Sequence, residues 1–178
     1  MSRHIYAFGA TCFLLGMLTQ LASGQARRPA FSADLYRGKD PAAAAAALLD
    51  GALRLAEDGS WERIAVGRAW YLGGDKARGQ QLFDQVTGSK DVEGSDWFRI
   101  GRVYAEAGEW DKAQAAFDRA LAVDTDDDSG MLEYGALANV RKDRDKAEAL
   151  FAKAFQKKPR AFWHWVGAGA SYLGVPPQ

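Results

Sequence analysis

The sequence predicts an all-α protein, a solenoid built from repeated helical hairpins. Glycine recurs with a 34-residue period, and the same period aligns three phenylalanines; the two series are Gly67, Gly101, Gly135 and Gly169, and Phe83, Phe117 and Phe151. Within the central copy, Trp97, Ile100 and Tyr104 fall at i, i+3 and i+7, on one face of a helix. A unit of this length cannot bury its apolar face alone, so neighbouring units must stack.

The central copy shows which kind of unit is repeated. Its motif is Trp97-x2-Ile100-Gly101-x2-Tyr104, followed by Gly108-Glu109-Trp110-x2-Ala113-x3-Phe117-x2-Ala120, and it resembles the tetratricopeptide repeat. The third copy matches with Met131, Tyr134, Gly135, Ala147, Phe151, Ala154 and Pro159, and the first copy is looser. Departures from the motif are Arg63, Ala138 and Lys142. The resemblance implies a right-handed solenoid of about three repeats, at 60–93, 94–127 and 128–161.

The N-terminus has the three-part form of a secretory signal peptide. Arg3 supplies a positive start, residues 5–21 are mostly apolar, and the small residues Ala22, Ser23 and Gly24 precede Gln25. We therefore expect residues 1–24 to be cleaved and the protein to be periplasmic or secreted. An uncleaved inner-membrane anchor stays open as the alternative, because about 17 apolar residues is the lower limit of a membrane span.

The repeats are flanked by further segments at both ends. Residues 25–39 are predicted to be a flexible lead-in, and 40–58 a helix that starts with the N-cap Asp40 and with Pro41. Ala45, Leu49 and Ala52 continue the second-helix columns one repeat period upstream, so this helix could be a degenerate half repeat; a low-complexity linker is the alternative. Residues 162–178 are expected to form a capping helix and a tail with a Gly/Pro stop.

The composition excludes several classes of chemistry. The 23 basic residues equal the 23 acidic ones, which argues against a nucleic-acid partner. One cysteine and two histidines cannot supply a zinc cluster, a disulfide framework or a Cys–His nucleophile. The acidic run 124–130 is interpreted as an inter-repeat turn rather than a calcium loop, and His164 has no recognisable partner carboxylate. We expect neither catalysis, nor a metal, nor a cofactor.

The resemblance implies a concave groove whose inner wall comes from the first helices. The groove residues expected here are Trp61, Ile64, Arg68, Tyr71, Phe98, Arg102, Leu132 and Asn139. Phe98 and Leu132 would form an apolar stripe, while Arg68 and Arg102 could bind a carboxylate. The alternative is that these side chains cover neighbouring helices and that the arginines pair with acids such as Glu106.

These features predict a non-enzymatic scaffold of a bacterial-type envelope that binds an extended protein segment or peptide in the groove. Membrane contact is expected only through an uncleaved targeting segment. The alternative function is a structural assembly subunit that oligomerises or docks end-on through its aromatic C-terminal helix, with Trp163 and Val166 at the contact. In a third interpretation, the apolar side of that helix packs on Phe151 and Phe155.

Overall fold

The computed structural model describes residues 32–177, and this part of the chain is helical without a strand. The predicted signal peptide and residues 25–31 of the lead-in lie outside the described residues. No helix in the described range is long and apolar enough to cross a membrane. The predicted all-α solenoid is confirmed. Its elements are the 3-10 turn η1 (Ala33–Leu35) and the helices α1 (Pro41–Leu55), α2 (Ser60–Leu72), α3 (Lys76–Thr87), α4 (Gly94–Glu106), α5 (Trp110–Val123), α6 (Asp128–Val140), α7 (Arg144–Lys157) and α8 (Phe162–Tyr172).

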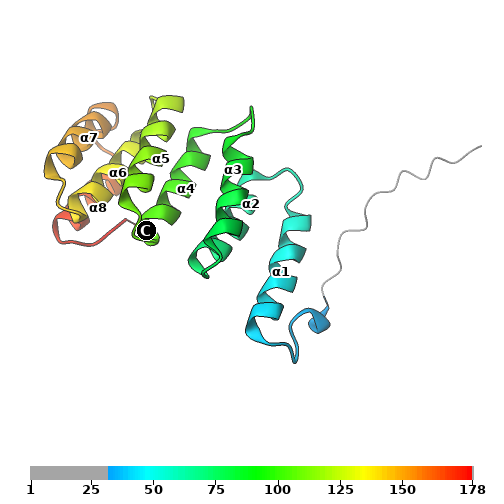
Figure 1. The fold of residues 1–178 in the computed structure, drawn as a ribbon. Coiled ribbons are helices and arrows are strands. Elements are labelled where there is room, and N and C mark those ends of the chain that lie inside the picture. Colours follow the sequence, from blue (N-terminus) through cyan, green and yellow to red (C-terminus); the bar gives the residue numbers. More distant parts are fainter. Residues whose placement is uncertain (1–31, 178) are drawn as a thin grey trace, which may run out of the picture.

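The helices form three antiparallel pairs, α2/α3, α4/α5 and α6/α7, which stack along one axis (Figure 1). Helix α1 stands at one end of the stack, and α8 packs against α6 and α7 at the other. The first helix of each pair and α8 begin at one constant interval, at Ser60, Gly94, Asp128 and Phe162. This interval equals that of the glycine series, so the sequence period is also the structural period.

Local capping explains where the helices begin. The Asp40 carboxylate accepts hydrogen bonds from the backbone N–H groups of Ala42 and Ala43, at 3.0 and 3.1 Å, so α1 starts at Pro41. Asp75 and Asp143 cap the second helices α3 and α7 in the same way. The lead-in differs in part from the expectation, because Ser32 caps the turn η1 and residues 32–39 are partly folded.

The turns within the pairs need a left-handed backbone. Gly74 and Gly108 supply it with φ of 108° and 77°. Lys142, which replaces the expected glycine in the third pair, adopts φ of 68° and keeps the turn. The departure in sequence therefore leaves the geometry of the repeat unchanged.

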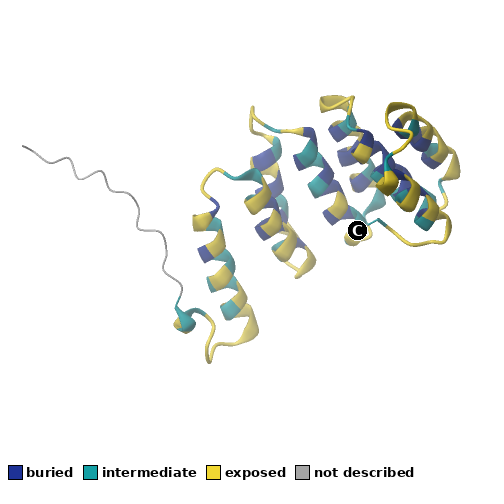
Figure 2. Cartoon of the chain, turned by 180° about the vertical axis from the view of Figure 1, so that it is seen from behind, coloured by how far each residue is buried: buried dark blue, intermediate teal, exposed yellow. Residues whose placement is uncertain are grey.

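The core lies between the two helices of each pair and between neighbouring pairs (Figure 2). Gly67, Gly101 and Gly135 each face one phenylalanine of the paired helix: a Cβ atom on these glycines would lie 2.6, 2.5 and 2.8 Å from the Cε1 atoms of Phe83, Phe117 and Phe151. Each ring occupies the space that a side chain would need. The 34-residue glycine series thus marks the closest approach of paired helices.

Candidate binding groove

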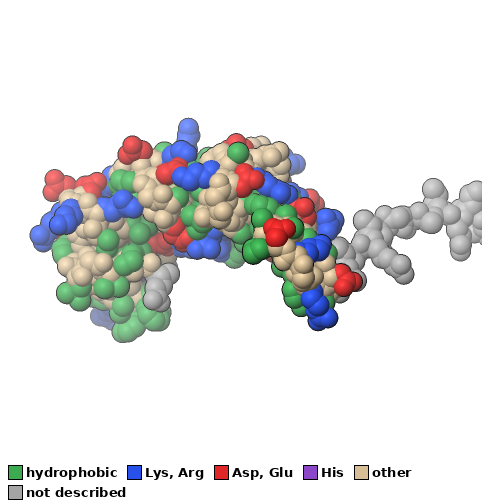
Figure 3. Space-filling view, turned by 60° about the horizontal axis from the view of Figure 1, so that its bottom comes forward, with side chains coloured by type: hydrophobic (Ala, Val, Ile, Leu, Met, Phe, Trp, Pro, Cys, Tyr) green, Lys and Arg blue, Asp and Glu red, His purple; other side chains and the backbone are tan. Residues whose placement is uncertain are grey.

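The first helices α2, α4 and α6, together with α8, line the hollow face of the array. Figure 3 shows this face, with charged side chains in its middle and hydrophobic side chains gathered on the lobe made by the C-terminal helices. The groove therefore has two chemically different parts, a charged floor and an apolar end.

Polar side chains connect successive first helices across the charged floor. The Arg68 guanidinium of α2 donates to the Glu106 carboxylate of α4, with Nη2–Oε2 at 2.6 Å, and Arg102 of α4 donates in the same way to Glu133 of α6. At the last step, Asn139 Nδ2 donates to the Ser171 hydroxyl of α8 at 3.0 Å. The hydrogen bond with Glu133 raises the pKa of Arg102. Arg68 and Arg102, which were expected to bind a carboxylate of a partner, are therefore already paired within the chain, as the alternative interpretation proposed.

Four predicted groove residues are buried: Ile64, Tyr71, Phe98 and Leu132. The Phe98 ring lies against Gly130 of α6, and Leu132 lies against Gly167 of α8, where a Cβ would come within 2.9 Å of Leu132 Cδ2. Because these glycines have no side chain, the facing side chain of the neighbouring first helix fills the contact. The expected open apolar stripe is thus wrong: these side chains join repeats, although edges of Phe98 and Leu132 border small cavities.

Tyr71 is buried, and its hydroxyl joins a partly exposed polar cluster of α2, α3 and α5 instead of the groove. Its hydroxyl donates to Glu109 Oε2 at 2.7 Å, and Lys112 Nζ lies 3.1 Å from the same hydroxyl. Lys112 and Lys76 also pair with Glu109. Hydrogen bonds from Lys112, Lys76 and Tyr71 lower the pKa of Glu109 to about 2, while burial raises the pKa of Tyr71.

Trp61, the remaining predicted residue of α2, is exposed. The Arg99 guanidinium lies 3.5 Å from the centroid of its ring, close enough for a cation–π contact. This contact joins α2 to α4 at the end of the groove opposite α8.

The apolar end of the groove contains a cavity of about 520 Å³ between α6 and α8. Trp163 and Val166 line it, and both are well exposed, Trp163 at 75%. The sequence predicts that these two residues dock partners on the end of the array, but the structure places them on the groove side of α8. The other lining residues are Ser129, Leu132, Glu133, Ala136, His164, Gly167, Ala170, Val175, Pro176 and Pro177.

The C-terminal tail borders this cavity. Gly174 turns the chain with φ of 78°, and the Val175 N–H bonds to the Ala170 carbonyl at 3.0 Å. Val175, Pro176 and Pro177 then line the α6–α8 cavity, and both prolines also line an adjoining cavity of about 360 Å³ beside Arg102 and Glu106. The groove therefore already contacts one irregular, apolar chain segment.

A buried contact between a histidine and a carboxylate, which the sequence analysis did not predict, fixes α8 to α6. His164 Nε2 lies 3.0 Å from Asp128 Oδ2, and Lys158 Nζ lies 2.8 Å from the other carboxylate oxygen. Burial alone would raise the pKa of Asp128, but Lys158 and His164 outweigh it and hold that pKa below its usual value. Asp128 and His164 are separated by one repeat plus two positions, a spacing that no sequence motif marks. His164 is thus not incidental: it anchors the last helix.

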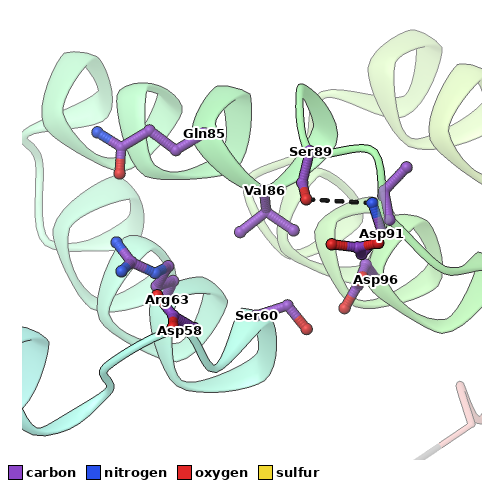
Figure 4. A pocket seen from close by; sticks show the side chains of 9 residues that line it. Asp58, Ser60, Arg63, Gln85, Val86, Ser89, Asp91 and Asp96 are labelled. Atoms are coloured by element: carbon purple, nitrogen blue, oxygen red, sulfur yellow. Dashed lines mark hydrogen bonds between the residues drawn. The ribbon is translucent and has the colours of Figure 1, made fainter.

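A second large cavity, of about 500 Å³, lies outside the groove where α2, α3 and α4 meet (Figure 4). Asp58, Asp91 and Asp96 line it together with Arg63 and Ser60. Asp96 is buried and its Oδ2 accepts from the Glu93 N–H at 3.0 Å, as part of the capping box of α4. Over residues 32–177, no group of three or more His, Cys, Asp or Glu side chains is placed to hold a metal ion.

Comparisons with known proteins agree with this geometry. The family model of the tetratricopeptide repeat matches residues 95–127, which span the central pair α4/α5. No curated protein matches the sequence.

Solved structures similar to the chain include two crystal structures of MamA, each 17% identical to it. The first has a TM-score of 0.52 over 75% of this chain and 77% of that chain; the second has 0.51 over 75% and 72%. A crystal structure of YrrB, a TPR protein with an unusual peptide-binding site, is 18% identical, with a TM-score of 0.49 over 73% and 66%. The MamA structures support the same overall fold for this chain.

Proposed function

We propose that this solenoid is a non-enzymatic scaffold that binds an extended, apolar protein segment in its concave groove. The observation that carries the proposal is the cavity between α6 and α8, where Trp163 and Val166 stay exposed beside a hollow of about 520 Å³. Exposed apolar surface around a concavity is typical of a binding site. The charged floor of the groove does not offer such a free surface, because its arginines are already paired within the chain.

The tail Gly174–Pro177 supports the choice of ligand. Its residues 175–177 have no regular secondary structure and contact the cavity through Val175 and two prolines. A partner segment of similar chemistry, short and apolar with proline, would meet the same walls and would compete with the tail.

A peptide selection tests this function. The purified chain is used to select peptides from a random library, and the affinity of selected peptides is measured by fluorescence anisotropy. Trp163→Glu with Val166→Glu places two charges in the cavity wall, and we expect it to weaken binding by at least about tenfold, because desolvating an unpaired charge is costly.

The matched control is Ala149→Glu with Ala152→Glu, on the exposed side of α7. It adds the same charge away from the groove and should bind as the wild type does. Peptides that bind the cavity variant and the wild type equally would contradict a groove function.

A second candidate function is favoured by the end face of α8. Trp165 and Tyr172 pack partly on α7, with ring centroids 5.1 Å from Phe155 and 6.3 Å from Phe151, as the third interpretation of the sequence expected. They nevertheless stay 64% and 49% exposed, although a helix that closes a solenoid is expected to be polar outside. In this candidate the protein is an assembly subunit that docks through its last helix, and Trp165→Glu on the end face should dissociate the assembly.

We also propose that the protein acts outside the cytoplasm, in a bacterial-type envelope. The support is the sequence of residues 1–24 alone, with its basic start, apolar stretch and small-residue end. Recovery of the chain from a periplasmic extract with Gln25 as its first residue is the expected result. Recovery of the full-length chain in the membrane fraction would favour an anchor instead.

A further inference from the structure

The repeat pattern is incomplete at both ends of the solenoid, in complementary ways. Helix α8 is a first helix without a paired second helix in the described chain, whereas α1 carries the columns of a second helix without a first. Each of the complete pairs is closed by a phenylalanine ring on a glycine, as described for Gly67, Gly101 and Gly135.

Gly169 is the fourth member of this glycine series, and its recess is empty. Apart from its chain neighbours and the adjacent backbone of α8, no atom of the described residues lies within 4 Å of the position that a Cβ on Gly169 would take, whereas Phe83, Phe117 and Phe151 crowd the other three glycines. Trp165 and Tyr172, four residues before Gly169 and three after it, flank this recess; each rests on one phenylalanine of α7 and keeps about half or more of its surface exposed. The end of α8 is therefore the receiving half of a helix pair.

Helix α1 presents the inserting half. Leu49 lies one repeat period before Phe83, and Ala45 and Ala52 lie one period before Gly79 and Val86. Gly79, Phe83 and Val86 are buried against α2, but Ala45 and Ala52 are exposed and Leu49 is only half-buried. Among residues 32–177, nothing thus covers fully the face of α1 on which a first helix would pack.

We propose that a second copy of this chain completes the repeat: α1 of one molecule packs on α8 of the next, with Leu49 in the recess at Gly169. This inference rests on the second candidate function, which makes α8 a docking end, and it names the partner. Both halves of the pair belong to the same chain and share its 34-residue register, which is what indicates a second copy rather than an unrelated helix.

The described chain does not fill the recess itself. After α8 it turns at Gly174 toward α6, where Pro176 and Pro177 line the groove cavities. Because different surfaces meet at the contact, the association is head-to-tail, and it continues into a chain of molecules unless the rotation closes a ring.

Complementary variants of the full chain test the proposal by light scattering over a range of concentrations. The wild type should show a mass that rises with concentration beyond that of a dimer. Leu49→Glu and Gly169→Leu should each weaken association by at least about tenfold, because the first replaces the inserted apolar side chain by a charge and the second fills the space that this side chain would enter. Gly169→Leu points into open space within one molecule, so it should leave the folding of that molecule intact.

Mixing distinguishes a head-to-tail contact from a symmetric one. An equimolar mixture of Leu49→Glu and Gly169→Leu retains one intact α1 and one intact α8, so we expect heterodimers and nothing larger. Leu55→Glu on α1 and Trp163→Glu on the groove side of α8 serve as matched controls and should associate as the wild type does, with circular dichroism checking the fold of every variant.

The outcomes separate two claims: that α8 is a docking end, and that α1 of a second copy completes the repeat there. If Gly169→Leu and Trp165→Glu dissociate the assembly but Leu49→Glu does not, α8 is a docking end and the completed repeat is wrong. A wild type that stays monomeric up to a few hundred micromolar overturns both the completed repeat and the assembly function. A milder variant, Leu49→Gln, keeps the test valid if Leu49→Glu lowers helix stability.

Discussion

Glu109 illustrates how one side chain can join three elements of this solenoid. It lies in the turn before α5 and accepts hydrogen bonds from Tyr71 of α2 and from the ammonium groups of Lys76 and Lys112, on α3 and α5. Because all three partners favour the ionised carboxylate, the pKa of Glu109 falls from 4.5 to about 2. A repeat motif does not encode such a cluster.

The lowered pKa predicts how stability depends on pH. Above pH 4.5 Glu109 is ionised in both states and its hydrogen bonds stabilise the fold fully; between pH 4.5 and about 2 only the unfolded chain is protonated, so stability falls as pH falls. Glu109→Gln should lower the free energy of unfolding by about 2 kcal/mol at pH 7 and flatten its decline across that interval. Urea midpoints at several pH values measure both effects.

The neighbouring variant Asp111→Asn controls for general charge effects. Asp111 is exposed in the first turn of α5, so its removal should leave the shape of the pH profile close to that of the wild type. A Glu109→Gln protein whose stability falls as steeply as the wild type below pH 4.5 would count against the cluster.

At the scale of elements, the glycines of one sequence series have opposite energetic roles. Gly135 is covered by the Phe151 ring, whereas Gly169 faces open space. Gly135→Ala should destabilise by about 1–3 kcal/mol, because the ring cannot move without opening the α6/α7 pair. Gly169→Ala should stabilise by up to about 1 kcal/mol, because alanine favours the helix and meets nothing. Thermal melts of the two variants, at a concentration where the chain is monomeric, compare them directly.

Helix order and register could be predicted from the sequence because the glycine and phenylalanine columns record the contact within each pair. The contact between neighbouring first helices is recorded less clearly. It depends on single sites such as Gly130, which lets the Phe98 ring enter, and Gly167, which receives Leu132. The sequence predicts Phe98 and Leu132 in an open groove because the period gives the order of the helices, but not the distance between them.

The same reason explains the buried pair at the C-terminal end. The sequence predicts Asp128 in an acidic turn, and it does begin α6 after the N-cap Asp127. Its pairing with His164 of α8 follows only from how α8 crosses the start of α6. A lone histidine and an acidic run, far apart in the sequence, carry no motif that joins them.

In the whole molecule, the central pair α4/α5 has a neighbouring pair on each side. Phe117 is completely buried, and its ring centroid lies 4.9 Å from that of Tyr134 on α6 and 5.4 Å from that of Phe98 on α4. The stability of a stacked array is approximately the sum of its repeats and of the interfaces between neighbours. A change in the middle repeat therefore weakens two interfaces together with its own helix pair.

Phe117→Ala tests how stability is distributed along the stacked repeats. We expect it to lower the free energy of unfolding by about 3–5 kcal/mol, a large part of the roughly 5–15 kcal/mol of an ordinary domain.

Because the weakened repeat separates the α2/α3 pair from α6, α7 and α8, unfolding of the Phe117→Ala protein should also lose its cooperativity. Urea transitions followed by circular dichroism, which reports all helices, and by tryptophan fluorescence, to which four of the six tryptophans contribute from α2, α4 and α5, should then have different midpoints. As a control, Leu55→Ala on the exposed side of α1 should keep the two transitions superimposed. A Phe117→Ala protein that loses less than about 1 kcal/mol, with coincident transitions, would show that the central ring does not hold the array together.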